Sequence, residues 1–148
     1  MQALIDFFPE NSIAIYPSAE HWEHAIDLSM ASLIDNHAVK PEYSQAIKDA
    51  THEIGPYYIL APEIAMPHAR PENGVNHTAL SLTLLRKGVI FDTDSEPVKL
   101  LIGLAAKDAD SHIYAIQALS EMFCDDESIT SLLNAANTEN IKDILKRY

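Results

Sequence analysis

The sequence has one cysteine, Cys124, among its 148 residues. A single cysteine excludes an intrachain disulfide and a metal site built from several thiolates. Basic residues are also scarce: 10 Lys and Arg stand against 22 Asp and Glu, for a formal net charge of −12. A chain with so few cations cannot assemble the basic face of a general nucleic-acid binder or of a protein that binds anionic membranes. The composition fits an acidic protein of a reducing compartment, and we expect it in the cytoplasm.

Long apolar runs are absent as well. No stretch approaches the roughly 20 apolar residues that span a bilayer. The N-terminal Met-Gln-Ala-Leu-Ile-Asp lacks the basic region of a signal peptide. There is no internal repeat, low-complexity segment or linker, and the apolar fraction of 47% is ordinary for a globular protein. We therefore expect residues 1–148 to form one domain.

Five segments show the apolar spacing of helices. Ser18 is a candidate N-cap for the first. Pro41, a residue favoured in the first helical turn, is expected to start the second, and Gly55 to end it. Thr138 is a candidate N-cap for the last. The expected helices cover about 19–36, 41–54, 112–124, 126–136 and 138–147.

Two segments in the middle of the chain have the patterns of strands. Residues 78–85 alternate, with three leucines on one face and small or polar residues on the other. Residues 98–105 are almost continuously apolar, which is typical of a strand covered on both faces. Shorter strands are expected at 12–16, 57–60 and 89–91, the last after a turn at Lys87-Gly88. Strands interleaved with helices predict an α/β fold, a single domain with a mixed β-sheet flanked by helices on both faces.

The stretch from Pro62 to Gly74 contains three prolines and the glycine, and it includes His68, with Arg70 two positions later. Prolines fix φ and lack a backbone donor, so they hold a stiff, non-helical loop on both sides of the imidazole. A stiff loop with one histidine suits chemistry that needs a placed nitrogen. The pattern also fits a proline-rich connection with a surface histidine, and the loop alone leaves both interpretations open.

His112 stands out among the other six histidines because it follows Asp110 and Ser111 at the expected start of a helix. The positive end of the helix dipole disfavours an imidazolium there, so we expect a neutral ring. A first-turn histidine facing water is the alternative. His21 and His24 are three residues apart on the first helix and could bind a metal weakly, although exposed helical histidines are common.

Three features together resemble a known family: the segment Ile64-Ala65-Met66-Pro67-His68-Ala69-Arg70-Pro71, the apolar strand at 98–106, and His112. They are similar to the enzyme IIA domains of the fructose/mannitol (type 2) class of the bacterial phosphoenolpyruvate-dependent sugar phosphotransferase system. The resemblance extends to residues 22–26 and 43–47, and so covers nearly the whole chain. The amino-acid sequence around the loop is most similar to that of the ascorbate-type branch.

The resemblance implies a phosphotransferase component that accepts a phosphoryl group from phospho-HPr. The group passes to an enzyme IIB partner, which serves a membrane enzyme IIC. His68 matches the phosphoryl acceptor, and His112 matches a second active-site histidine that bonds the phosphoryl oxygens or tunes the pKa of His68. Arg70 is a candidate clamp for those oxygens, or else a surface charge. No metal or cofactor is expected, because such transfer needs positioning and hydrogen-bond donors, which a protein can supply.

One position departs from the family pattern. Mannitol-type members carry an arginine in the second helix, sixteen residues before the active histidine, and this chain has His52 there. The departure favours the ascorbate-type branch. We expect His52 to be a solvated residue near the helix end, with partial substitution for the arginine as the alternative.

Two other functions remain open at this stage. A regulatory IIA-like protein would be phosphorylated in the same way but would signal to a regulator and not feed a transporter. A metal-dependent hydrolase could use His68 and His112, but the sequence has no His-Glu-x-x-His or His-x-His spacing.

Overall fold

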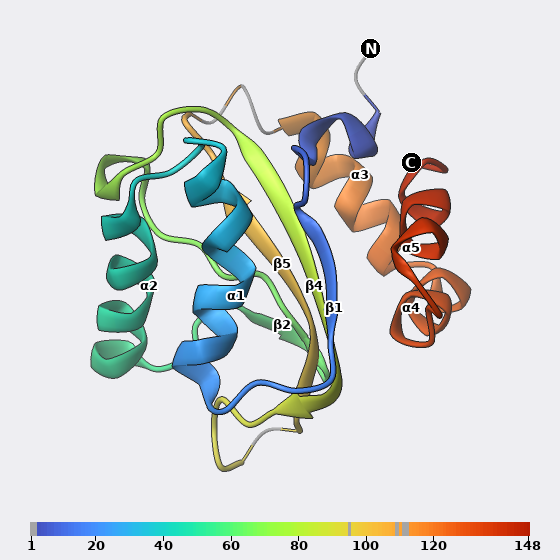
Figure 1. Ribbon diagram of the computed structural model, residues 1–148, viewed down its shortest axis with the longest axis horizontal. Helices are drawn as coiled ribbons and strands as arrows, with labels where there is room; N and C mark the ends of the chain where they lie inside the picture. The colour runs from blue at the N-terminus through green and yellow to red at the C-terminus, as the bar shows by residue number, and fades with distance from the viewer. Residues whose placement is uncertain (1–2, 95, 109, 111–112) are drawn as a thin grey trace.

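The computed structural model describes residues 3–94, 96–108, 110 and 113–148 (Figure 1). Its helices and strands follow one another as η1 (Leu4–Phe7), β1 (Ile13–Tyr16), α1 (Trp22–Asp35), α2 (Pro41–Ile54), β2 (Ile59–Ala61), β3 (Ile64–Ala65), η2 (Pro71–Asn73), β4 (Ala79–Val89), β5 (Val98–Ala105), α3 (Ile113–Phe123), α4 (Asp126–Leu133) and α5 (Thr138–Leu145). Within the described residues no helix is long and apolar enough to cross a membrane.

The strands form one mixed sheet in the order β1-β4-β5-β3-β2. The central pair, β4 and β5, is antiparallel. β1 adds to β4 in parallel, β3 adds to β5 in parallel, and β2 closes that edge antiparallel to β3. The expected mixed sheet is therefore confirmed, and the chain segment that carries His68 leaves it at β3.

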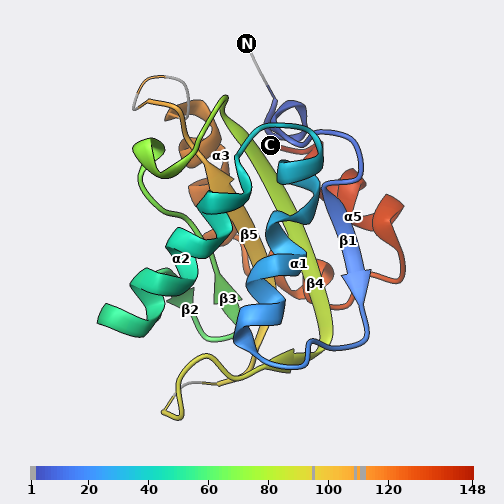
Figure 2. The ribbon, with the colours of Figure 1, turned by 60° about the vertical axis from the view of Figure 1, so that its left-hand side comes forward.

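Helices cover both faces of the sheet, as expected. Figures 1 and 2 show α1 and α2 on one face, and α3, α4 and α5 on the other. Each layer has its own apolar core, because successive side chains of a strand point to opposite faces. Leu80, Leu82 and Leu84 enter the core under the C-terminal helices, while Ala79 and Leu85 enter the core under α1 and α2.

The small residues of β4 and β5 let α1 lie close to the sheet. The Ser81 hydroxyl donates a hydrogen bond of 2.6 Å to the carbonyl of Ser29 in α1. A Cβ at Gly103, the partner of Ser81 in β5, would lie 2.3 Å from the Ser81 Oγ and 3.2 Å from the Ser29 carbonyl oxygen. Only a glycine at 103 leaves room for this hydrogen bond. The small face of β4 thus serves packing.

Two helix starts differ from the sequence expectation. α1 begins at Trp22, and its N-cap is His21 in place of Ser18, because the His21 Nδ1 accepts a hydrogen bond from the His24 backbone N–H. α5 is capped by Asn137 and not by Thr138: the Asn137 side chain accepts from the Asn140 N–H at 3.0 Å. In both cases a residue with a side-chain acceptor stands next to the helix and satisfies an otherwise unpaired donor.

The strands also differ in detail. β4 runs through the expected turn at Lys87-Gly88 and reaches Val89, which pairs with Val98. Gly88 has φ of 73° there, and the register shifts nearby, so a bulge replaces the turn. β3 was not expected. The strand expected at 57–60 begins only at Ile59, which leaves Tyr57 and Tyr58 in a turn after α2.

Candidate functional site

The loop that carries His68 is fastened to the fold at several points. Its start is tied by the Met66 N–H, which donates to the Tyr58 carbonyl at 2.9 Å. The carbonyl of Pro67, a buried residue, accepts a hydrogen bond of 3.0 Å from the Leu104 N–H near the end of β5. At the other end the Gly74 carbonyl accepts from the Lys40 N–H, just before α2. The stiff frame expected from the prolines is thus also held by hydrogen bonds to α2 and β5.

The imidazole of His68 is half-buried, and its Nδ1 lies 2.7 Å from the Met66 carbonyl oxygen. A carbonyl oxygen can only accept, so the shared proton is on Nδ1. In the neutral ring this leaves the lone pair on Nε2. The local backbone therefore leaves Nε2 as the ring nitrogen with an available lone pair.

Two tyrosines contact the residues at the tip of the loop. The ring of Tyr57 meets the His68 ring edge to face, with 5.5 Å between centroids and 85° between planes. Its hydroxyl donates a hydrogen bond to the His68 carbonyl. The hydroxyl of Tyr43, a fully buried residue of α2, accepts from the Ala69 N–H at 2.9 Å and donates to the Leu104 carbonyl at 2.8 Å.

Both tyrosines are neutral near pH 7. Burial raises the pKa of Tyr43 to about 12, and it raises the pKa of Tyr57 above its ordinary value. The sequence predicts a helix at 41–54, which includes Tyr43, and a strand at 57–60, which includes Tyr57, and neither prediction gives the contacts of these two side chains with the loop. The chain carries six tyrosines and no spacing signal that separates these two from the others.

An open hollow of about 620 Å³ lies beside His68. One wall is the face of α2 that carries two alanines, Ala46 and Ala50, together with Glu53 and Ile54. The other wall is Tyr57 and the loop itself from His68 to Asn73. The alanines leave room, and the hollow is open to solvent, so a phosphoryl-sized group can reach the imidazole.

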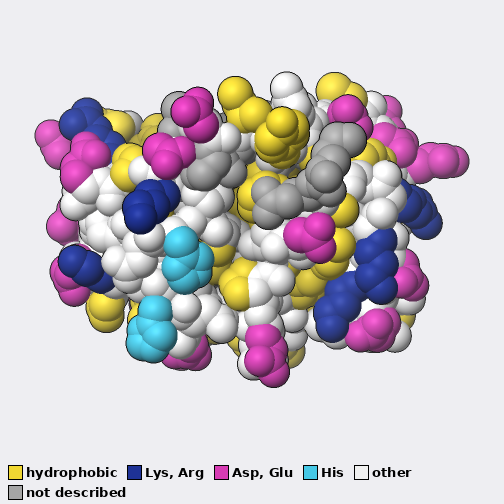
Figure 3. All heavy atoms as spheres, turned by 90° about the horizontal axis from the view of Figure 1, so that it is seen from above, with side chains coloured by type: hydrophobic (Ala, Val, Ile, Leu, Met, Phe, Trp, Pro, Cys, Tyr) yellow, Lys and Arg dark blue, Asp and Glu magenta, His cyan; other side chains and the backbone are white. Residues whose placement is uncertain are grey.

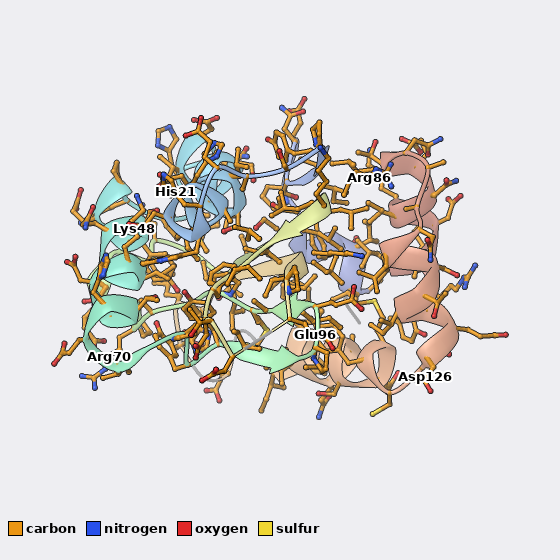
Figure 4. The ribbon with its side chains drawn as sticks, turned by 90° about the horizontal axis from the view of Figure 1, so that it is seen from below. His21, Lys48, Arg70, Arg86, Glu96 and Asp126 are labelled. Atoms are coloured by element: carbon orange, nitrogen blue, oxygen red, sulfur yellow. The ribbon has the colours of Figure 1, made fainter. Side chains whose placement is uncertain are left out.

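Arg70 lines the same hollow and is exposed. Figure 4 shows it at the edge of the molecule beside α2. Among the described residues no carboxylate forms an ion pair with it. Its guanidinium is therefore free to engage an anion, and the hollow places it on the same side of the loop as the imidazole.

Two further candidate residues from the sequence are His112 and His52. His112 and Ser111 lie outside the described residues, so the role of His112 stays a prediction. His52 is exposed and packs edge-on against Trp22, with 5.0 Å between centroids, and its Nε2 lies 3.8 Å from a Glu23 carboxylate oxygen. It does not line the hollow. His52 is thus a surface residue near the helix end, as expected.

The histidines of α1 act in helix capping. The His21 Nδ1 accepts from the His24 N–H, and the His24 Nδ1 accepts from the Glu20 N–H at 3.0 Å. In the part of the chain that the structure describes, no group of three or more His, Cys, Asp and Glu could hold a metal ion.

Comparison with known proteins gives this geometry a family. The family described as "Phosphoenolpyruvate-dependent sugar phosphotransferase system, EIIA 2" matches residues 6–148. The mannitol-specific cryptic phosphotransferase enzyme IIA component of Escherichia coli (strain K12) is 56% identical over 144 residues, which cover 97% of this chain and 98% of that protein. The ascorbate-specific PTS system EIIA component of the same organism is 37% identical over 147 residues, 97% of this chain and 96% of that protein.

Solved structures agree. The solution structure of the mannitol-specific cryptic enzyme IIA from Escherichia coli superposes with a TM-score of 0.93 at 55% identity, covering 99% of this chain and 100% of that chain. The complex of enzyme IIA and phosphorylated enzyme IIB of the Escherichia coli mannitol system contains a chain with a TM-score of 0.80 at 26% identity, covering 95% and 98%. Of the two relatives, the mannitol-named one is more similar to this chain than the ascorbate-specific one. The chain belongs to the EIIA 2 family of the phosphoenolpyruvate-dependent sugar phosphotransferase system and is a phosphotransferase component of that system.

Proposed function

We propose that residues 1–148 form one phosphocarrier domain that accepts a phosphoryl group from phospho-HPr on the Nε2 of His68. The group then passes to an enzyme IIB partner, which supplies a membrane enzyme IIC. The observation that carries the proposal is the hydrogen bond between the His68 Nδ1 and the Met66 carbonyl at the mouth of an open hollow. It leaves one ring nitrogen unprotonated on a ring that the fold holds in place.

The chemistry follows from that tautomer. The Nε2 lone pair attacks phosphorus as the bond from phosphorus to the donor histidine breaks, and the donor nitrogen keeps the electron pair. Because the Nδ1 proton stays, the phosphorylated ring carries positive charge, which the Met66 carbonyl stabilises by accepting the hydrogen bond. The transition state is loose, so positioning and hydrogen-bond donors supply most of the catalysis. The reverse steps deliver the group to enzyme IIB.

Arg70 is the proposed clamp for the phosphoryl oxygens, because its guanidinium lines the hollow and a planar fork of donors matches a phosphoryl group. His112 is proposed as the second histidine on the strength of the family pattern alone. Neither role needs a metal ion or a cofactor. We also propose a cytoplasmic location, where the phosphoryl donor and the enzyme IIB partner would be met.

An apolar groove next to the loop is proposed to receive enzyme IIB. It holds about 330 Å³ between Leu60 and Met66 on one side and Ile116, Leu119 and Phe123 of α3 on the other. Met66 is two residues from His68 and its carbonyl pairs with the imidazole, so a partner seated there would lie next to the loop that carries His68. Figure 3 shows Asp and Glu side chains across the whole of one face, with a few Lys and Arg among them. The net charge of −12 would attract a basic partner over long range and so raise the rate of encounter.

The carbohydrate served is proposed to be of the ascorbate type or a related one. The loop wording and the 37% identical relative support this, while the mannitol-named relative at 56% makes a hexitol the competing substrate. Transport assays in cells that carry this chain with its own enzyme IIB and IIC would decide between them.

The test of the phosphocarrier proposal is phosphorylation of the purified chain by phosphoenolpyruvate, enzyme I and HPr. Mass spectrometry should find one added phosphoryl group, located at His68. His68→Ala should abolish the label, while the control His77→Ala, which changes an exposed histidine outside the hollow, should keep it. An unlabelled wild type, or equal labelling of His68→Ala, would show that the proposal is wrong.

A further inference from the structure

The two tyrosines of the site hold the same chemical unit. The Tyr57 hydroxyl donates to the carbonyl of His68, and the Tyr43 hydroxyl accepts from the N–H of Ala69. That carbonyl and that N–H belong to one peptide group, the one between His68 and Ala69. The peptide plane is therefore held at both of its polar ends, by residues from two different parts of the fold.

The two anchors differ in rigidity and origin. Tyr43 is fully buried in α2, and its hydroxyl also donates to the Leu104 carbonyl at 2.8 Å, so it ties the peptide to β5. Tyr57 lies in the turn between α2 and β2 and is 39% exposed. Its ring also packs edge to face against the imidazole of His68. One tyrosine therefore fixes the peptide to the sheet, and the other fixes both the peptide and the ring.

Holding this peptide plane controls the imidazole. Rotation of the plane changes ψ of His68 and moves its Cα–Cβ bond relative to the Met66 carbonyl. The 2.7 Å hydrogen bond to Nδ1 has little tolerance for such movement, because hydrogen bonds weaken steeply with poor distance and angle. Misplacement of a reacting nitrogen also lowers the rate of transfer directly.

We propose that Tyr43 and Tyr57 are positioning residues for phosphoryl transfer, which fix the His68–Ala69 peptide and through it the direction and tautomer of the His68 imidazole. The proposal rests on the function proposed for His68. Neither tyrosine is required to touch the phosphoryl group. Each acts through the backbone of the acceptor residue.

The chain provides a matched control. Tyr58 is also buried, with 1% exposed, and its hydroxyl lies 2.8 Å from the Thr51 hydroxyl. That hydroxyl makes no contact with the 68–69 peptide. Tyr58→Phe therefore removes a buried tyrosine hydroxyl and a side-chain hydrogen bond while leaving the support of His68 intact.

The experiment compares Tyr43→Phe, Tyr57→Phe and Tyr58→Phe in the full chain. Rapid-quench measurements at saturating phospho-HPr should show a three- to tenfold slower transfer for the first two, about what loss of one hydrogen bond gives, with little change in KM. Nitrogen-15 NMR of the unphosphorylated protein should show the Nδ1–H tautomer of His68 in the wild type and a growing share of the Nε2–H tautomer in those two variants. Tyr58→Phe should lower stability yet leave rate and tautomer unchanged.

Wild-type rate and tautomer in both Tyr43→Phe and Tyr57→Phe would overturn the proposal. So would an equal effect of Tyr58→Phe, because general loosening would then explain the result. The NMR measurement needs no donor protein, so it tests the tyrosines even if the wild type proves not to be phosphorylated, which is the separate failure of the phosphocarrier function.

Discussion

The close approach of α1 to the sheet makes Gly103→Ala a sharp test of the fold that supports the site. The added methyl would stand 2.3 Å from the Ser81 Oγ, which is far inside the van der Waals contact distance of two non-bonded atoms. It would also meet the Ser29 carbonyl oxygen and the Met30 side chain, each at 3.2 Å. Relief therefore requires either rotation of Ser81 or a shift of α1.

The size of the effect follows from these contacts. Overpacking a close-packed core costs about 1–3 kcal/mol, and rotation of Ser81 adds the loss of its hydrogen bond to Ser29, about 1 kcal/mol. Replacing glycine restricts the unfolded chain and returns about 0.4–1 kcal/mol. We therefore expect Gly103→Ala to lower the free energy of unfolding by about 1–3 kcal/mol.

Urea unfolding, followed by circular dichroism, measures this, and Ser81→Ala supplies the decisive comparison. Removing the Ser81 hydroxyl removes the nearest clash, so the double variant should be more stable than the sum of the two single effects predicts. We expect a coupling of about 1–2 kcal/mol, as is usual for residues in direct contact. Strict additivity, or a Gly103→Ala protein as stable as the wild type, would refute the packing argument.

Three further outcomes are expected. Arg70→Gln should slow phosphoryl transfer about tenfold or more, which is the value of a charge-assisted hydrogen bond. Arg70→Lys should give a rate between those of Arg70→Gln and the wild type, and neither variant should change the melting temperature. A wild-type rate for Arg70→Gln would show that Arg70 does not bind the phosphoryl group. Leu60→Glu should raise the KM for transfer to enzyme IIB about tenfold, because it places a charge in the apolar groove. Ile90→Glu changes a residue of similar exposure outside that groove and should leave this KM unchanged. Equal effects of the two variants would exclude the groove as the enzyme IIB site. Hydrogen bonds from Ser128 and Tyr148 lower the pKa of Asp125. The ionised carboxylate therefore stabilises the folded protein above the ordinary Asp pKa, and this contribution is lost as the pH falls through the lowered value. The stability difference between wild type and Asp125→Asn should vanish in acid, and a difference independent of pH would contradict this.

The sequence predicted best those elements whose ends or burial are signalled by residues within the element itself. α2 runs from Pro41 to Ile54, between a proline that favours the first turn and the glycine that ends the helix. β5 covers 98–105, where the run is apolar except for Lys99, the pattern of a strand buried on both faces. β3 was missed because two residues between prolines show no periodicity, and β4 was cut short because Gly88 signals a turn as readily as a bulge.

The site divides in the same way. His68 and Arg70 could be proposed from the sequence because the residues around them resemble a known family, whereas the prolines alone left a surface histidine equally open. The contacts of Tyr57 and Tyr43 join residues 11 and 26 positions apart. They exist because α2 and the turn that follows it pack beside the loop, and this is set by the tertiary arrangement and by no spacing in the chain.

The structure shows which residues α2 presents to the loop in the absence of the arginine that mannitol-type members carry in this helix. The face of α2 toward the loop carries Ala46, Ala50, Glu53 and Ile54, at helical spacing, while His52 lies against Trp22 instead. Among the described residues that line the hollow, Arg70 carries the one permanent positive charge, and Glu53 and Glu72 add two carboxylates. The described lining of the hollow therefore has one cation and two anions. If His68 is phosphorylated as proposed, Arg70 would attract the phosphoryl group and the two carboxylates would repel it, which disfavours long storage of the group at this position.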